Sequence, residues 1–352
     1  MRKKKPINIF SKLIKKSSIA GIIFLLFTAL YQMGDTAYSD QTAELPSSEH
    51  PVRLYSNQSS DDLAQLYLEA IKSAKQSVTL VIYSLLDHRV IAALQQKALA
   101  GIPVHIICDA KASPGISRKL PNATIVKRIA KGLTHQKILI IDQNKILLGS
   151  ANMTHDSLRS HGNLVVGLEN PGLAKLMVAK ARSMDDEGKY EALKHQIVKA
   201  GTQTVELWEL PDDSGAVERV VQLLRAAKKS IRIAMFTWTR TDFTQELIHA
   251  SLRGVKVETV IDRYSGKGAS AKIVKMLQGG KIPVHFNTTQ GLLHYKLAYI
   301  DEEILVNGSA NWTNAAFKDN DDVFLVIYPL TNEQRTKMNQ LWQTIWQQSI
   351  QA

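Results

Sequence analysis

Residues 135–152 read HQKILIIDQNKILLGSAN, and residues 294–311 read HYKLAYIDEEILVNGSAN. Eight of the eighteen aligned positions are identical, and most of them carry polar or small side chains. The two stretches lie about half a chain length apart. The chain therefore carries the same set of polar residues twice, which indicates that functional side chains, and not only a segment of backbone, have been duplicated.

The repeat extends far beyond these two stretches, so we interpret it as duplication of a whole lobe. From His135 to His294 the offset is 159 residues, whereas upstream of them the matching residues are 153 apart. The second copy has thus gained six residues, which we place near RYSGKGASAK, residues 263–272. The upstream matches are Val52-Arg53-Leu54-Tyr55 with Val205-Glu206-Leu207-Trp208, Ser77 with Ser230, Gly101 with Gly254, and Asp109 with Asp262.

Each copy predicts the same order of elements. Apolar residues three and four apart predict helices, runs of branched and aromatic residues predict buried strands, and the quoted stretches predict hairpins that turn at Gln143-Asn144 and Glu302-Glu303. Strands that alternate with helices indicate an α/β fold. The expected helices are 62–75, 90–100, 216–229, 244–253 and 335–350, and the expected strands include 78–85 and 231–238.

The predicted domain organisation follows from the repeat. The first lobe spans 46–170 and the second spans 204–352, and between them 171–203 is expected to be a helical connector. Residues 1–45 are set apart by the apolar run Ile19–Leu30, which follows a basic head. That run has the length of a signal-peptide core, so we expect export to the periplasm or the medium, either after cleavage or with the segment kept as a membrane anchor.

The composition is that of a folded globular protein, with 45% hydrophobic and 22% charged residues. Cys108 is the single cysteine, so an internal disulfide and a cysteine zinc site are excluded. The net charge is +12, but seven basic residues and one acid fall within residues 1–39. The remaining basic excess suits a phosphate-bearing partner and does not distinguish a nucleic acid from an anionic lipid surface.

The repeated polar residues are the part of the sequence that indicates a function. His135 and Lys137 are two residues apart at the start of a buried strand, so both side chains project from one face. The same spacing recurs at His294 and Lys296, and both copies fit His-x-Lys, four residues, Asp, six residues, Gly-Ser-x-Asn. This pattern resembles the sequence motif of the phospholipase D superfamily, and the duplicated lobes extend the resemblance over residues 50 to 350.

The resemblance implies two lobes, each a mixed β-sheet flanked by helices, that meet about a pseudo-twofold axis with one active site between them. One imidazole attacks phosphorus and forms a phosphohistidine, and the other protonates the leaving alcohol and then activates water. We assign the attack to His135 and the acid and base steps to His294. The resemblance implies no metal and no cofactor, and since one chain supplies both half-sites, no protein partner is needed.

The remaining motif residues receive supporting roles. Lysine, asparagine and serine side chains are expected to donate to the phosphate oxygens. Asp142 and Asp301 lie five residues beyond the lysines, on the opposite strand face, and are expected to be structural. Family members usually carry an acid eleven residues beyond the asparagine; here Asn163 departs from that and Asp322 keeps it. The expected phosphate donors are Lys137, Lys296, Asn152, Asn311, Ser150 and Ser309.

The motif is expected to contact only the phosphate group of a substrate, so it does not decide between several classes of substrate. The leading prediction is hydrolysis of a membrane glycerophospholipid to phosphatidic acid and an alcohol. The alternatives are a non-specific endonuclease acting on nucleic acid, a cardiolipin synthase or transphosphatidylase, and an inactive phosphate- or membrane-binding module. His155 and His161 follow the first GSAN and are further candidates for substrate contact, and Tyr83, Trp238 and Trp312 are candidates to flank the cleft.

Overall fold

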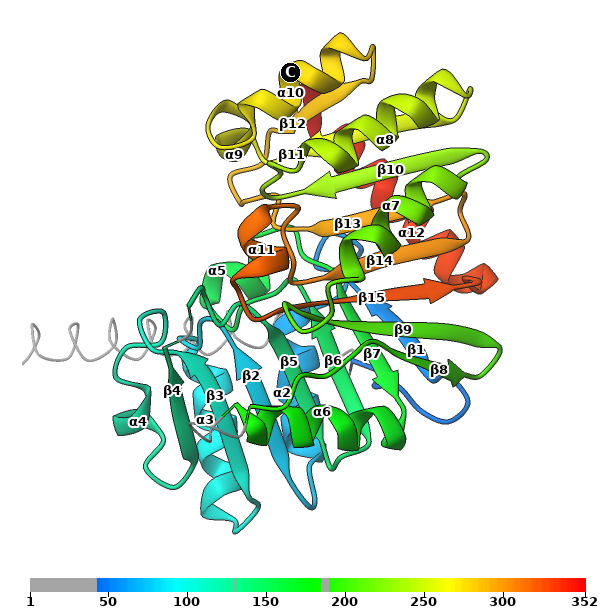
Figure 1. Cartoon of the computed structure of the whole chain (residues 1–352). Coiled ribbons are helices and arrows are strands. Elements are labelled where there is room, and N and C mark those ends of the chain that lie inside the picture. Colours follow the sequence, from blue (N-terminus) through cyan, green and yellow to red (C-terminus); the bar gives the residue numbers. More distant parts are fainter. Residues whose placement is uncertain (1–42, 130, 185–189) are drawn as a thin grey trace, which may run out of the picture. The chain divides into compact units, whose positions relative to one another are not determined.

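The structure, a computed structural model, describes residues 43–129, 131–184 and 190–352. The proposed leader therefore lies outside the described residues, apart from its last three positions. The described part forms two mixed β-sheets with helices (Figure 1), which confirms the predicted α/β class. Within it, none of the helices combines the length and the apolar character that crossing a membrane requires.

The first sheet, as far as the structure describes it, has seven strands in the order β1-β7-β6-β5-β2-β3-β4. The neighbours β2-β3 and β3-β4 run parallel and the other pairs run antiparallel. The strands are β1 Val52–Tyr55, β2 Val78–Ile82, β3 Val104–Asp109, β4 Thr124–Arg128, β5 Lys137–Ile141, β6 Lys145–Gly149 and β7 Val165–Glu169.

The second sheet repeats this arrangement and extends it. Its described strands follow the order β16-β12-β11-β10-β13-β14-β15-β9-β8, with β13 between β10 and β14 as β5 lies between β2 and β6. The repeat predicted from the sequence is therefore a repeat of sheet topology. The strands are β8 Gln196–Ala200, β9 Gln203–Leu210, β10 Ser230–Met235, β11 Lys256–Ile261, β12 Val284–Asn287, β13 Lys296–Ile300, β14 Ile304–Gly308, β15 Asp322–Tyr328 and β16 Ser349–Gln351.

Several helices begin at side chains that accept hydrogen bonds from the first turn. Asp62 and Asp87 accept backbone N–H groups at the starts of α2 and α3, and Thr331 and Gln334 form a capping box at α12. The helices are α2 Leu63–Ser73, α3 His88–Leu99, α4 Ile116–Lys119, α5 His155–Arg159, α6 Pro171–Ser183, α7 Ala216–Ala226, α8 Thr241–Leu252, α9 Arg263–Lys267, α10 Ala271–Gly279, α11 Asn314–Lys318 and α12 Asn332–Gln347.

The central strands of each sheet are buried on both faces, which explains why they are largely apolar. In β2, Leu80 and Ile82 pack against α2 and α3, whereas Val81 between them faces a core shared with the second lobe. That shared core also receives Met177 of α6 and Leu341 of α12. Burying each such side chain contributes about 1.5–3 kcal/mol, so the shared core stabilises the packing of one lobe on the other.

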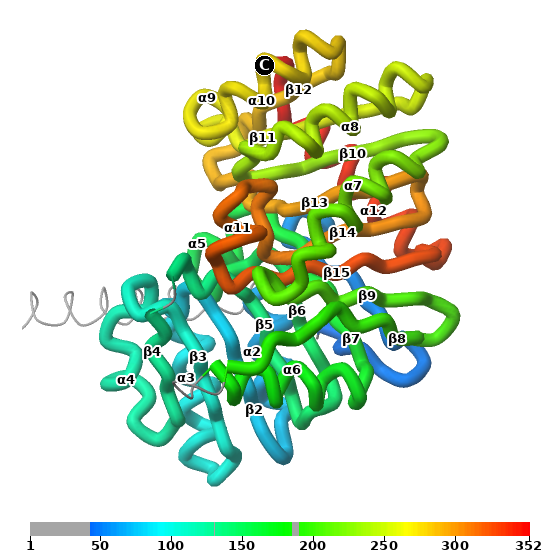
Figure 2. The backbone as a smooth tube through the Cα atoms, in the orientation of Figure 1, coloured from blue at the N-terminus to red at the C-terminus, as the bar shows by residue number. Residues whose placement is uncertain are grey.

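The prediction of a helical connector over 171–203 is wrong in its second half. Helix α6 ends at Ser183, and Gln196–Ala200 forms β8, which pairs antiparallel with β9 at the edge of the second sheet (Figure 2). The turn between them contains Gly201, whose positive φ of 60° suits a glycine. In β8, Ile197 is exposed and points away from the core, so helical spacing of apolar residues did not describe this segment.

The two predicted hairpins are present, with turns one residue earlier than expected. Asp142 and Gln143 have φ values of 54° and 50°, and Asp301 and Glu302 have values of 54° and 60°. Both turns therefore have positive φ at their two central residues, as in a type I′ turn.

The structure also accounts for the motif aspartates. Asp142 accepts the backbone N–H groups of Lys75, Gln76 and Ser77, and Asp301 accepts those of Lys228, Lys229 and Ser230. Each carboxylate ties a hairpin turn to the segment that leads into the neighbouring strand. Both aspartates are thus placed as structural residues at the far end of the strand from the histidines.

Candidate active site

Two pieces of backbone pairing bring the histidines together at the boundary between the lobes. Thr134 bridges to Asp321, and Leu293 bridges to Gly162. In consequence the His135 N–H donates to Asp321 O at 2.8 Å, and the His294 N–H donates to Gly162 O at 2.9 Å. Thr134 and Leu293 occupy equivalent positions in the two copies, and so do Gly162 and Asp321. The two contacts are therefore equivalent, as a pseudo-twofold relation between the lobes requires.

The first histidine is oriented by an acid from the other lobe. His135 Nδ1 lies 2.8 Å from Asp322 Oδ1, and both side chains are buried. Burial alone would raise the pKa of Asp322, but His135 and Lys137 outweigh it and lower that pKa. The carboxylate is therefore ionised and accepts the Nδ1 proton, which leaves Nε2 of a neutral His135 unprotonated.

The second histidine is oriented by an amide instead. His294 Nδ1 lies 3.1 Å from Asn163 Oδ1. The direction of this bond is fixed, because Asn163 Nδ2 donates to the carbonyl oxygens of Ser157 at 2.8 Å and His161 at 3.2 Å. The Asn163 oxygen must therefore face His294, which donates its Nδ1 proton. A neutral amide holds the ring in the same tautomer without adding a negative charge.

The serines of the motif support these two residues. Ser309 Oγ donates to Asp322 Oδ1 at 2.6 Å, and Ser150 Oγ donates to Asn163 Oδ1 at 2.8 Å. A hydroxyl has one proton to give. The expectation that these hydroxyls donate to phosphate is not met in this geometry, since each proton is already used to fix a side chain behind a histidine.

Each motif glycine permits a close approach of backbone to backbone. A Cβ added to Gly149 would lie 2.2 Å from Leu164 O, and one added to Gly308 would lie 2.2 Å from Val323 O. Any other residue would push away the strand that begins just after Asn163 in the first lobe or at Asp322 in the second. The glycine therefore keeps the orienting side chain within reach of its histidine.

The two lysines are buried beside the histidines, each over an aromatic ring. Lys137 Nζ donates to His135 O and lies 5.2 Å from the centroid of the Tyr83 ring. Lys296 Nζ donates to His294 O at 2.8 Å and lies 5.0 Å from the centroid of the Phe236 ring. Such cation–π contacts help to hold an ammonium group that has lost its water.

Burial lowers the proton affinity of the lysines and the histidines, and the lysine charges lower that of the histidines further. Burial lowers the pKa of Lys137 to about 7 and that of Lys296 well below its usual range, with the charge of Lys137 adding to the effect on Lys296. Burial also lowers the pKa of both histidines, most strongly that of His294, which Lys296 and Lys137 lower further. An anion placed among these groups would reverse the shifts, so the site is suited to bind one.

The motif asparagines occupy corresponding positions after β6 and β14. Asn311 Oδ1 accepts the Thr237 N–H at 3.2 Å. Asn152 Oδ1 is buried and has no hydrogen-bond partner among the described residues. Donation from their amide groups to a phosphate remains a prediction.

Comparison with known proteins agrees with this geometry. The family model described as cardiolipin synthase, PLD-like domain, matches residues 67–184 and 220–346. These two ranges cover more than half of the chain. The chain belongs to the phospholipase D superfamily.

Individual relatives are more distant. Phospholipase D of Rickettsia typhi is 35% identical over 114 residues, which cover 32% of this chain and 55% of the relative. Human mitochondrial cardiolipin hydrolase is 29% identical over 118 residues, or 33% of this chain and 46% of the relative. The chain thus spans about half the length of these curated relatives.

A solved structure supports the two-lobed phospholipase D fold over nearly the whole chain. Phosphatidylserine synthase of Haemophilus influenzae superposes with a TM-score of 0.69, covering 91% of each chain at 12% identity. At this identity the likeness concerns the fold alone. It confirms that both lobes, and not only one motif, follow the family's architecture.

Some residues of the phospholipase D-like site were missed by sequence reasoning. Phe236 takes the place beside His294 that Tyr83 takes beside His135, with ring centroids 4.9 Å and 5.3 Å apart. Tyr83 and Phe236 differ by the 153-residue offset, so the repeat held the signal. Trp238 and Trp312, expected as candidates for the cleft, instead pack against each other in the buried core of the second lobe.

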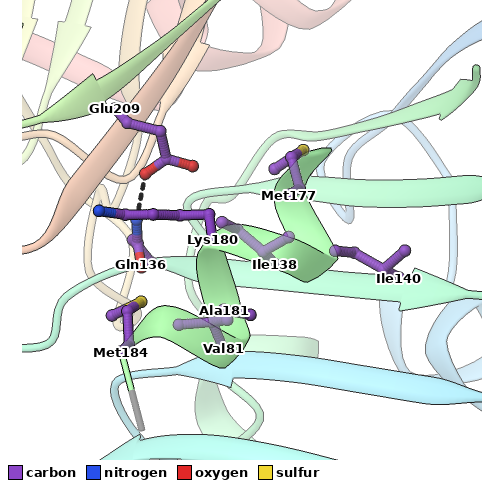
Figure 3. Close-up of a pocket in the computed structure, with 9 residues that line it drawn as sticks. All are labelled: Val81, Gln136, Ile138, Ile140, Met177, Lys180, Ala181, Met184 and Glu209. Atoms are coloured by element: carbon purple, nitrogen blue, oxygen red, sulfur yellow. Dashed lines mark hydrogen bonds between the residues drawn. The ribbon is translucent and has the colours of Figure 1, made fainter. Parts of the chain in front are cut away.

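A small cavity lies on the opposite face of β5 from Lys137 (Figure 3). Gln136, between His135 and Lys137, points into it and donates to Glu209 of β9. The lining also includes Lys180 of α6. Burial raises the pKa of Glu209 to about 8, although Lys180 opposes the shift. In the first half-site of this phospholipase D-like chain, the residue between His135 and Lys137 is therefore held by a buried acid.

Proposed function

We propose that this chain is a metal-independent phosphodiesterase that hydrolyses a glycerophospholipid to phosphatidic acid and a head-group alcohol. One observation carries the proposal: His135 and His294 come from different lobes, and each is held in its tautomer by a side chain from the other lobe. A histidine pair of this kind supplies a nucleophile and a general acid to one phosphodiester.

In the first step, His135 Nε2 bonds to phosphorus while the bond from phosphorus to the head-group oxygen breaks. His294 gives the Nε2 proton of its imidazolium to that oxygen, and the phosphate's own charge favours this protonated state. In the second step, His294 takes a proton from water, the water oxygen bonds to phosphorus, and the bond to His135 breaks. Lys137 and Lys296 stabilise the charge on the non-bridging oxygens in both steps.

The unequal partners of the two histidines support this assignment of roles. A phosphorylated imidazole with a proton on Nδ1 is cationic for the lifetime of the intermediate, and the Asp322 carboxylate stabilises that charge. An acid must instead release its proton readily. His294, held by the neutral Asn163 amide and with a strongly lowered pKa, is suited to that task.

The choice of a lipid substrate rests on the relatives. The chain resembles proteins named phospholipase D and mitochondrial cardiolipin hydrolase. The charge needed at the phosphate is supplied by lysines in the proposed scheme, so we expect activity without a divalent cation.

The test incubates the full chain with mixed phospholipids and with plasmid DNA, each in excess EDTA. We expect release of phosphatidic acid and intact DNA. DNA cleavage without lipid turnover would favour the endonuclease alternative, and cardiolipin formation from added phosphatidylglycerol would favour transphosphatidylation. Loss of all activity on chelation would contradict the metal-independent scheme, and inactivity on every substrate would favour a binding module.

A second test separates the histidines by trapping the covalent intermediate from a substrate that is labelled at phosphorus and has a good leaving group, so that the first step does not need the proton of His294. His294→Ala should accumulate labelled protein, because the second step then lacks its base, whereas His135→Ala should accumulate none. His249→Ala is the matched control, because His249 is exposed on α8. Label in His135→Ala alone would reverse the assignment, and label in neither variant would contradict covalent catalysis.

A further inference from the structure

A third imidazole lies beside the acid half of the site. The ring centroids of His161 and His294 are 6.3 Å apart, and the rings are tilted by 47°. His161 is partly buried, with Asp156, Lys296 and Asp262 as its charged neighbours. Neither of its ring nitrogens has a hydrogen-bond partner within the part of the chain that the structure describes, although its backbone N–H and carbonyl are both used.

The corresponding residue of the other lobe has a different task. Asn320 lies 159 residues after His161; its Oδ1 accepts the Leu133 N–H at 3.0 Å, and its Nδ2 donates to Asp322 Oδ2 at 3.3 Å. Both polar atoms of that side chain therefore hold the half-site together. His161 occupies the same place in the repeat but leaves its ring free, so its role is not merely a copy of this structural one.

We propose that His161 forms a subsite for the leaving group and selects a head-group alcohol that carries further hydroxyl groups, such as glycerol. This rests on the proposed function, in which His294 protonates the leaving oxygen; a ring beside His294 is then beside the departing head group. Burial lowers the pKa of His161 and keeps the ring neutral. A neutral imidazole offers one donor and one acceptor, which matches a hydroxyl group.

The site is less suited to a quaternary ammonium head group. Such a group has no hydrogen-bond donor and is usually held by aromatic faces. The two aromatic rings that contact the catalytic histidines, Tyr83 and Phe236, already lie under the ammonium groups of Lys137 and Lys296. The two large indoles of the neighbouring core, Trp238 and Trp312, are buried.

The test compares two lipids of equal charge and chain length, phosphatidylglycerol and phosphatidylpropanol, in mixed micelles with the full chain. The second lacks both head-group hydroxyls. One neutral hydrogen bond changes an equilibrium or a rate by about 2- to 10-fold, so we expect wild-type kcat/KM to favour phosphatidylglycerol by that factor. His161→Ala should remove the preference while phosphatidylpropanol turnover stays within about twofold.

Two further variants make the result decisive. In His161→Asn the side-chain oxygen can accept the Leu292 N–H as Asn320 accepts the Leu133 N–H, so this variant should fold, turn over phosphatidylpropanol and lose the preference even if His161→Ala does not fold. His155→Ala is the matched control, because the His155 side chain is 68% exposed on α5, and it should keep the preference. Equal turnover of both lipids by the wild type, or a preference that survives in His161→Asn, overturns the proposal. Turnover of neither lipid by the wild type rejects the proposed function itself.

Discussion

The two half-sites share one framework and differ in charge. His135 and His294 are each held through Nδ1 by a side chain eleven residues beyond the opposite motif's asparagine, and each has a lysine over an aromatic ring. The framework residues, which are the glycine, the serine and the turn aspartate, do the same work in both lobes. The residue that sets the local charge does not, since one lobe supplies Asp322 and the other supplies Asn163.

This difference shows how a symmetric scaffold can serve an asymmetric reaction. The carboxylate of Asp322 raises the pKa of His135 against the effect of burial, whereas His294 has only positively charged neighbours and its pKa falls well below its usual range. A two-step transfer needs one histidine that tolerates lasting positive charge and one that exchanges protons. The unequal partners provide those two environments without a change in backbone.

The largest expected effect comes from making the half-sites alike. Asp322→Asn should preserve the hydrogen bonds of His135 and Ser309 but remove the negative charge that stabilises a phosphorylated His135. We expect kcat/KM to fall roughly 100- to 1,000-fold, measured as release of phosphatidic acid. The thermal unfolding midpoint serves as the control for folding. A loss below about fivefold in a folded variant would break the assignment of His135 as nucleophile.

The lowered pKa of Lys137 should make the binding of an anion to the site depend on pH. Burial lowers the pKa of Lys137 to about 7, so in the empty site this group loses its proton as the pH rises above 7. A bound anion favours the protonated form, so binding takes up a proton there. The inhibition constant of sulfate, whose charge is constant in this range, should therefore rise up to about tenfold per pH unit above pH 7.

Lys137→Met is the variant that isolates this effect. It should bind sulfate more weakly at pH 6 and show a flatter dependence above pH 7, because the titrating group is gone. Lys72→Met on the outer helix α2 is the control, since its ion pair within the described part of the chain is with Glu69 at the surface. An inhibition constant independent of pH in the wild type would contradict the lowered pKa of Lys137.

Adding the missing carboxylate should have a smaller effect of opposite sign. In Asn163→Asp, a negative charge 3.1 Å from His294 Nδ1 would favour the imidazolium form and raise the pKa of His294. The limb of the kcat/KM profile that falls with rising pH should then move upward by about one unit. Asn57→Asp is the control for added charge, because the Asn57 side chain contacts the backbone N–H of Asn163 and the backbone carbonyl of His161 and makes no hydrogen bond to the His294 ring. An unmoved profile would show that His294 is not the acid.

Much of this organisation could be predicted from the sequence, because local patterns encode it. The hairpins, the outer helices and the structural aspartates follow from spacing within one lobe. The crosswise partners do not, since a position eleven residues beyond an asparagine gives no information about which lobe's histidine it faces. Likewise Gln196–Ala200 became a strand because β9 offered an edge to pair with, which is a tertiary effect that overrides local helical spacing.

The smallest expected effect concerns the supports behind the half-sites, which also differ in charge. Gln136 contacts the buried Glu209, whereas the equivalent Tyr295 contacts the neutral Ser56, with the two hydroxyl oxygens 3.0 Å apart. Burial raises the pKa of Glu209 from its ordinary value of 4.5 to about 8. Between these values the folded protein keeps a proton that the unfolded chain has released, so stability falls as the pH rises from 4.5 to 8.

Glu209→Gln should remove this dependence, because a neutral amide keeps the contact with Gln136 and does not titrate. The free energy of unfolding from urea titrations should decline by roughly 1 kcal/mol less per pH unit in the variant than in the wild type between pH 5 and 8. Ser56→Ala, in the other half-site, should lower stability equally at every pH, since neither Ser56 nor the buried Tyr295 titrates in that range. Parallel curves for Glu209→Gln and the wild type would show that Glu209 is ionised in the folded protein, and the two supports would then differ in shape and not in charge.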